Sequence, residues 1–417
     1  MTTSDRGPRC PRHHLAQDLG ALEDPYPLLE SVRSSGAVVR VRLYERFDVW
    51  WVTGYAAAVA ALSATELSSD QRHAHPALAC HVSPMRVGLI DKDPPEHTLL
   101  RGKTLRAFSG ARLAAFEQDA RTLGASLVGE LPPEHTVDLL PALVGPLVER
   151  TVSTFLGLPP VVDSALRAHA EQLTRPMTAD AVRTEIGRAR AVLRRHVRAG
   201  GVAEGGHSED GQQPPGIGMR GHLPSDEWAD IVLQMYVAGR QSTVDFLAGT
   251  LLGLLAVEGW AHLCQDASVR LTAVDEFLRL DGPIVRGVWR FARTDLDLAG
   301  TAVARGDIVI VSLALAGRDP QVFPDSARLD IHRTPNRHLQ FGLGAHRCVG
   351  VPLVRSLADA LLLALAARFP EARPSPACSG RTARRGSVFR GPARVPIDLG
   401  PAYQPAPLDS PTPRRNA

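Results

Sequence analysis

One long apolar segment constrains the fold of this chain more than any other feature. Residues 225–257 begin with Ser225, a favourable helix N-cap residue, and carry Asp226 and Glu227 where the helix dipole favours acids. The rest of the segment is mostly apolar. At 1.5 Å per residue, a helix of this length is about 50 Å long. Because it is apolar on most faces, we expect a buried helix around which the other elements pack.

The remaining pattern predicts a helical protein with a small β part. Residues 37–53 are rich in β-branched and aromatic residues and predict a hairpin turning near residues 44–46. A strand-like stretch covers 295–313, and a meander follows at 316–340. Apolar spacing predicts further helices at 55–63, 95–107, 112–129, 138–157, 161–198, 268–281 and 349–369. The fold class is therefore mainly α with a small β subdomain.

We expect one catalytic domain over residues 21–400. Residues 1–20 and 401–417 are rich in Pro and Arg and are predicted to be flexible tails. Residues 199–222 are rich in Gly and Pro and predict a loop.

Composition excludes several classes of function. The 47 basic residues are balanced by 44 acidic ones, so the chain lacks the positive field of a nucleic-acid-binding protein. Its five cysteines include no CxxC pair, which argues against a disulfide framework and a cysteine-rich zinc site. The sequence has no apolar run of 18 residues and no secretory signal, so we expect a cytoplasmic protein that does not bind a membrane.

One glycine-rich segment carries chemistry. Residues 341–350 read Phe-Gly-Leu-Gly-Ala-His-Arg-Cys-Val-Gly, with Cys348 just before the last predicted helix. Glycines at 342 and 344 permit backbone conformations that other residues resist. The N-terminal dipole of the following helix favours a thiolate at Cys348. A lone cysteine in such a turn is also compatible with simple core packing. The choice between a functional cysteine and a packing cysteine therefore depends on the whole segment.

This segment resembles the haem-binding signature of the cytochrome P450 family, F-G-x-G-x-H-x-C-x-G, at every specified position, and Leu353 and Arg355 extend the match. The resemblance implies the cytochrome P450 fold, in which the long helix crosses the molecule over a haem b. It implies that Cys348 is the axial ligand of the haem iron. A thiolate ligand favours O–O bond cleavage. The other residues of the segment implied to contact the cofactor are Phe341, Gly342, His346 and Gly350.

Two further motifs resemble the same family. Glu276 and Arg279 match its E-x-x-R pair, and Arg328 is similar to the third member of that structural triad. Cationic side chains suit the burial of haem carboxylates. By resemblance, four residues hold the haem propionates: His97, Arg101, Arg290 and His338.

The long predicted helix at residues 225–257 departs from the family pattern. Where the family has an acid followed by threonine, which deliver protons, this chain has Gln241 followed by Ser242. An amide cannot supply a proton by ionising, and serine lacks the β-branch that stiffens threonine. The sequence leaves open whether Asp245 or Arg240 takes part in proton delivery. By resemblance, Ala238 contacts the haem, and the catalytic positions are Gly239, Gln241, Ser242 and Thr243.

Three functions remain open. The first is a monooxygenase of a small apolar or aromatic molecule in bacterial secondary metabolism, with protons relayed through Ser242, water or the substrate. The second is an oxidase that couples or cyclises an aromatic natural product by C–C or C–N bond formation without inserting oxygen. The third is a non-catalytic haem-binding protein.

The resemblance also implies a pocket and redox partners. Dioxygen is the co-substrate, and electrons are expected from NAD(P)H through a separate ferredoxin and ferredoxin reductase. Arg347 and Arg355 lie near the thiolate segment, where basic residues can help dock an acidic partner. The positions expected to contact substrate are Met85, Val87, Leu89, Val237, Arg240, Ile284, Val285, Val288, Val388 and Phe389.

Overall fold

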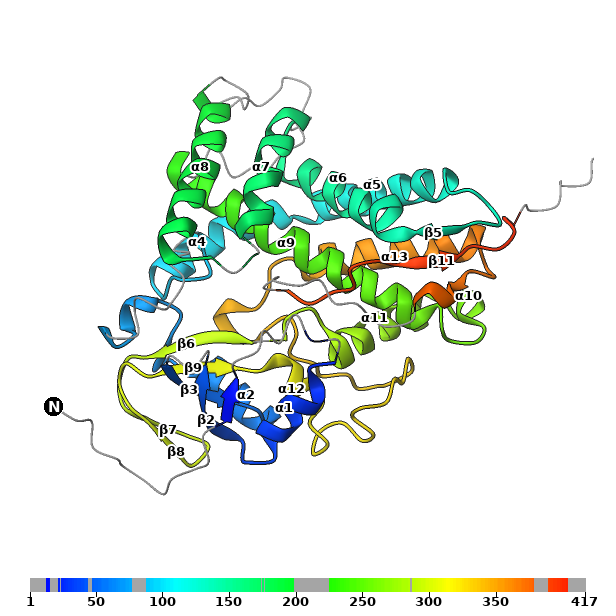
Figure 1. Ribbon diagram of the computed structural model, residues 1–417. Helices are drawn as coiled ribbons and strands as arrows, with labels where there is room; N and C mark the ends of the chain where they lie inside the picture. The colour runs from blue at the N-terminus through cyan, green and yellow to red at the C-terminus, as the bar shows by residue number, and fades with distance from the viewer. Residues whose placement is uncertain are drawn as a thin grey trace, which may run out of the picture.

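A computed structural model of the chain has a helical part and a smaller part built on β-sheet (Figure 1). In Figure 1, α5, α6, α7 and α8 lie at the top of the view, the largest sheet lies below, and α9 runs between them. This arrangement confirms the predicted fold class. The structure describes residues 13–15, 22, 24–43, 47–76, 88–173, 175, 177–198, 225–285, 287–378 and 389–403.

The helices follow the predicted pattern closely. Short 3₁₀ turns lie at Gln71–His73, Arg106–Phe108, Gly344–His346 and Pro376–Cys378. The described α-helices are α1 (Tyr26–Arg33), α2 (Tyr55–Ser63), α4 (Glu96–Leu105), α5 (Gly110–Gly129), α6 (Gly145–Leu156), α7 (Pro160–Leu173), α8 (Ala179–Arg198), α9 (Ser225–Leu254), α10 (Trp260–Leu263), α11 (Ala267–Asp281), α12 (Leu313–Gly317) and α13 (Val351–Arg368).

The strands form three sheets. The largest has the order β1-β2-β3-β9-β6-β4, the second β10-β11-β5, and β7 pairs with β8. Strands β2 and β3 form the predicted hairpin, with Val38 opposite Val52. The strands are β1 (His13–Leu15), β2 (Val38–Leu43), β3 (Phe47–Val52), β4 (Leu67–Ser68), β5 (Thr136–Asp138), β6 (Val288–Ala292), β7 (Leu296–Leu298), β8 (Thr301–Val303), β9 (Ile308–Val311), β10 (Arg373–Pro374) and β11 (Pro396–Asp398).

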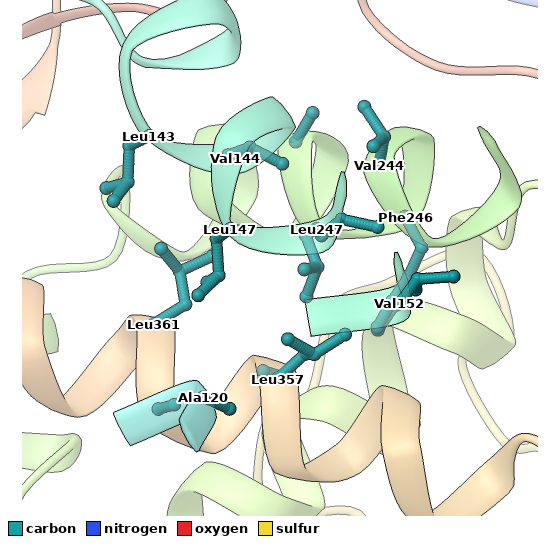
Figure 2. Packing of buried hydrophobic residues seen from close by; sticks show 14 of the residues in the cluster. Ala120, Leu143, Val144, Leu147, Val152, Val244, Phe246, Leu247, Leu357 and Leu361 are labelled. Atoms are coloured by element: carbon teal, nitrogen blue, oxygen red, sulfur yellow. The ribbon is translucent and has the colours of Figure 1, made fainter. Parts of the chain in front are cut away.

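Helix α9 is the buried central helix that the sequence predicts. Its 30 residues span about 45 Å, because it ends at Leu254, three residues before the predicted end. Val244, Phe246 and Leu247 of α9 pack in one apolar cluster with residues of α5, α6 and α13 (Figure 2). This packing holds α9 against α6 and α13, and α13 is the helix that begins just after the cysteine segment.

Three local predictions need correction. The segment 161–198 forms two helices, α7 and α8, rather than one; Pro176 lies between them in the sequence, and proline lacks the N–H that a helix interior requires. The segment 138–157 opens with a π-helical turn at Leu140–Val144 before α6 begins. Strand β6 precedes the predicted β region, because its place is set by pairing with β9 rather than by local pattern. The loop 199–222 and most of both predicted tails lie outside the described residues.

Candidate functional site

Cys348 lies in a tight turn immediately before α13. Its backbone N–H donates to the carbonyl of Phe341 over 2.8 Å, and the N–H of Gly350 donates to its Sγ over 3.3 Å. Gly342 and Gly344 have φ of +69° and +70°, a conformation that other residues rarely adopt. A Cβ on Gly344 would also lie 3.0 Å from the carbonyl oxygen of Leu62. The turn therefore closes around the sulfur only with glycine at these positions.

The surroundings of Cys348 act on the pKa of its thiol in two opposite directions. The side chain is exposed, yet the protein around it raises the pKa of the thiol by burial. The N–H of Gly350 and the charges of Arg101 and Arg347 act in the opposite direction but do not outweigh burial. The backbone N–H groups at the start of α13 thus act in the direction that the sequence predicts, and the thiolate form of Cys348 stays a prediction. Binding to a metal ion would remove the proton, because a coordinating thiol is deprotonated outright.

Three basic side chains, His97, Arg290 and His346, lie close together beside this turn. The rings of His97 and His346 are tilted by 39° to each other with centroids 4.1 Å apart, and the charge of Arg290 acts on both. Arg290 is 5% exposed, and burial lowers its pKa to about 10. Burial, aided by Arg290 and His97, lowers the pKa of His346 to about 3. Both histidines are therefore neutral donors at neutral pH, and Arg290 is a buried cation.

Unused hydrogen-bonding capacity in this group indicates an anionic partner. His97 is 1% exposed, and within the described part of the chain neither of its ring nitrogens has a hydrogen-bond partner. Buried polar groups are rarely left without partners, so such atoms need an explanation. The carboxylates of a haem would supply acceptors for His97 and a counter-charge for Arg290. The donor set and the glycine-lined cysteine turn therefore fit a haem.

His338 has a different environment from these residues. Its Nε2 lies 3.5 Å from Asp275, which also accepts from Arg355 over 2.8 Å. Burial would raise the pKa of Asp275, but these two basic partners hold it below its ordinary value. The structure thus gives His338 a protein carboxylate as a partner, and its contact with a haem propionate stays a prediction.

One stripe in the middle of α9 is half-buried, whereas most residues around it are buried. Ala238, Gly239 and Ser242 lie on this stripe, and a Cβ on Gly239 would meet nothing within 4 Å. The Ser242 hydroxyl donates to the carbonyl of Ala238. Thr243 is 4% exposed and donates to the carbonyl of Gly239 over 2.6 Å. Ser242, rather than Thr243, is therefore the hydroxyl that a bound small molecule can reach.

A hydrogen bond joins Gln241 to Asp245, and both residues are buried on α9. The Gln241 amide Nε2 donates to Asp245 Oδ1 over 2.9 Å, and the two residues are 8% and 2% exposed. The amide is thus held by a carboxylate one helical turn further along.

Arg240 does not face the predicted pocket. Its side chain is 8% exposed and pairs with Glu149 of α6, and Glu171 of α7 lies 3.7 Å away. Arg167 of α7 joins the same Glu149 over 2.6 Å. The predicted contact of Arg240 with substrate is wrong, because these carboxylates lie on the other side of α9.

The structural triad uses a different third residue from the one predicted. Glu276 and Arg279 are fully buried and make two bonds of 2.7 and 2.8 Å. The side chain that completes the group is Arg333, whose Nε lies 3.2 Å from Glu276. Arg328 is exposed and contributes its carbonyl to Arg279, so its predicted role was wrong. Both arginines lie in the meander between residues 316 and 340. Which of the two side chains reaches Glu276 depends on the fold of that segment and cannot be told from its sequence.

The predicted pocket residues divide into two groups. Ile284, Val288 and Phe389 are partly exposed, as a pocket lining requires. Leu89 and Val237 belong to the main core, and Val285 packs in a second core beneath the sheet, so their side chains serve packing. Met85, Val87 and Val388 lie outside the described residues.

Sequence reasoning missed a polar anchor of the histidine pair. The Ser69 hydroxyl lies 3.0 Å from His346 Nε2, and the Ser69 N–H donates to Asp93 over 3.0 Å. Ser69 is 277 positions before His346, and no local motif marks it.

Comparison with known proteins gives the same assignment as the geometry. The sequence pattern of the family described as Cytochrome P450 matches residues 271–370. The cytochrome P450 monooxygenase PikC of Streptomyces venezuelae is 32% identical over 85% of this chain and 87% of its own length. The 6-deoxyerythronolide B hydroxylase of Saccharopolyspora erythraea is 29% identical over 90% of this chain and 96% of its own. The chain belongs to the cytochrome P450 family.

A solved structure agrees in fold. The cytochrome P450 enzyme CxnD, for C–S bond formation in chuangxinmycin biosynthesis, has a TM-score of 0.83 over 95% of this chain and 99% of its own, at 22% identity. At this identity the likeness establishes the fold alone. The predicted enzyme class is confirmed: the protein is an oxidoreductase of the cytochrome P450 type. Among the helices described, none combines the length and apolar character that crossing a bilayer demands.

Proposed function

We propose that Cys348 is the axial ligand of a haem b and that the protein is a monooxygenase of a small apolar or aromatic natural product. The observation that carries this proposal is that the two ring nitrogens of buried His97, close to Arg290 and the Cys348 turn, have no hydrogen-bond partner among the residues that the structure describes. When bound, the haem supplies the oxidising chemistry, and a thiolate ligand favours O–O cleavage.

The chain's own residues then have separate tasks. His97, Arg101 and Arg290 bind and orient the haem carboxylates, and Ser69 keeps the His346 ring in place. The Cys348 turn holds the sulfur through its bond from the Gly350 N–H. Ser242 presents a hydroxyl on the accessible stripe of α9, where it can hold a proton near the reacting atoms.

The substrate proposal combines the pocket and the relatives. Ile284, Val288 and Phe389 are apolar and partly exposed, which suits a compact apolar ligand. Relatives named for 6-deoxyerythronolide B hydroxylation and for polyketide biosynthesis support a product of bacterial secondary metabolism. We propose that electrons come from NAD(P)H through a ferredoxin and its reductase in the cytoplasm.

One observation favours a second candidate reaction. Gln241 occupies the position where the family carries an acid, so proton supply next to Ser242 is altered. Oxidative C–C or C–N coupling or cyclisation of an aromatic natural product needs no oxygen insertion and is the alternative reaction.

The two reactions differ in product mass. We expect a library of polyketide and aromatic natural products to yield binders by their spectral change on the haem-loaded protein. Turnover of those binders with a surrogate ferredoxin system should give products heavier by one oxygen atom. Products that have lost two hydrogens or have dimerised would favour coupling, and spectral binders that never turn over would favour the non-catalytic function.

The residue roles have an independent test. Replacing Arg290 with leucine removes the buried cation, so we expect the haem-to-protein ratio of the purified protein to fall severalfold. Arg328→Leu, in an exposed arginine, is the matched control and should retain haem as the wild type does. Equal haem content in both variants would contradict the carboxylate-binding role.

A further inference from the structure

We infer that Gln234 is a substrate-recognition residue, whose side-chain amide N–H donates a hydrogen bond to an acceptor oxygen, such as a carbonyl, on the molecule that the protein oxidises. The inference rests on the proposed function, because it requires a small molecule to bind beside the half-buried stripe of α9. It narrows the substrate class to apolar molecules that carry an oxygen acceptor at a defined distance from the oxidised carbon.

The first observation is the place of Gln234 on α9. It lies four positions before Ala238 and eight before Ser242, and side chains four positions apart are neighbours on a helix surface. Gln234 is half-buried, as Ala238 and Ser242 are, whereas residues 231–233 just before it are buried. Gln234 therefore extends the half-buried stripe by one turn toward the start of α9.

The second observation is a turn of the chain that holds the Gln234 amide in one orientation. Its Oε1 accepts from the backbone N–H of Leu89 and, over 3.3 Å, from that of Ile90. Because only the oxygen of an amide accepts hydrogen bonds, these two donors determine which end of the side chain faces the turn. Gly88 has φ of +75°, and a Cβ there would overlap Oε1, so this close approach requires glycine.

The third observation is the unused donor at the other end of the amide. The Gln234 Nε2 can donate two hydrogen bonds. Among the residues that the structure describes, no group accepts from it, and the atom is not fully buried. A ligand that displaces water from such a donor retains the hydrogen bond only if it offers an acceptor. One fixed polar group in a mostly apolar lining is what orients a ligand in a small-molecule pocket.

The spacing on α9 sets the position of the acceptor oxygen on the substrate. Eight positions of helix separate Gln234 from Ser242, which corresponds to about 12 Å along the axis. The proposed function places the reacting atoms near Ser242. The substrate is therefore long enough to reach from Ser242 to Gln234, with its acceptor oxygen at the end away from the oxidised carbon.

The test measures this distance with probes that are anchored at the iron. Haem-loaded wild type is titrated with 1-alkylimidazoles of increasing chain length and with matched probes that end in a methyl ketone. An imidazole nitrogen binds iron, and the change in the haem spectrum reports the dissociation constant. Over one range of chain length the ketone should bind about threefold to tenfold more tightly than the hydrocarbon, the gain of one neutral hydrogen bond. Shorter ketones should show no such gain.

Two variants separate recognition from a structural role. Gln234→Glu keeps an oxygen for the Leu89 N–H but removes the donor. At mildly alkaline pH, which favours the ionised carboxyl, it should lose the ketone preference and instead bind a matched probe that ends in an ammonium group more tightly. Gln234→Met should lose the ketone preference without gaining the ammonium preference. Gln265→Glu, the same change in an exposed glutamine between α10 and α11, is the matched control and should keep the wild-type preferences.

The outcomes distinguish this inference from the proposed function. A wild type without ketone preference at any chain length, or a Gln234→Glu variant with an unchanged preference, would overturn the inference. Unsubstituted imidazole should bind the wild type and all variants alike, and their carbon monoxide spectra should match. A wild type that does not retain haem, or whose haem does not respond to imidazole, would instead refute the proposed haem function.

Discussion

Replacing Arg333 tests the corrected structural triad. The Glu276 carboxylate is 0% exposed and accepts from Arg279, Arg333, Asn336 and the backbone of Asp330. Arg333→Ala removes one charge-assisted bond of about 1.5–3 kcal/mol, while Arg279 still neutralises the carboxylate. The larger loss of about 3–5 kcal/mol, which follows when a buried charge is left bare, is therefore not reached. We expect the free energy of unfolding to fall by about 2 kcal/mol.

Urea denaturation of matched variants measures this difference. Arg328→Ala is the control, because its side chain is exposed and only its carbonyl bonds to Arg279. Surface changes of this kind stay within about 0.5 kcal/mol. Should Arg328→Ala destabilise the protein as much as Arg333→Ala does, the assignment of the third triad member would be wrong.

Two more predictions concern charged groups that link α9 to its neighbours α6 and α7. Arg240→Met removes one charged partner of Glu149, which Arg167 still neutralises, and should lower the free energy of unfolding by about 2 kcal/mol. Ligand affinities in binding spectra should stay unchanged. A large change in affinity with little destabilisation would show that Arg240 contacts the ligand. Burial would raise the pKa of Asp163, but hydrogen bonds from Ser153, Tyr236 and Arg167 hold it below its ordinary value. The ionised Asp163 therefore stabilises the fold above the ordinary carboxyl pKa, and this stabilisation is lost as the pH falls through the lower pKa of the folded state. The urea midpoint of Asp163→Asn should consequently fall less steeply with acid than that of the wild type. Parallel curves of midpoint against pH would contradict this.

Local pattern predicted much of the fold. The hairpin β2–β3, helix α2 and helix α11 lie within one residue of their expected bounds, because alternation and helical spacing are local properties. The buried character of α9 also followed from its composition alone. Strand β6 did not, since its pairing with β9 is set by chain segments that lie apart in sequence.

The sequence likewise predicted the local features of the candidate site but not its long-range contacts. The turn around Cys348 is contiguous, so the sequence predicted it together with its glycines. Long-range partners were beyond reach: Glu149 lies 91 positions from Arg240, and Ser69 lies 277 positions from His346. Whether an arginine meets a substrate, a carboxylate or solvent depends on packing of distant helices, which no motif records.

The carbon monoxide difference spectrum of the ferrous protein tests the central proposal most directly. The wild type should show the spectrum of a thiolate-ligated haem, Cys348→Ala should lose it, and Cys264→Ala, in another cysteine of the chain, should keep it. A thiolate-type spectrum that survives in Cys348→Ala would contradict the assignment of this sulfur to the iron.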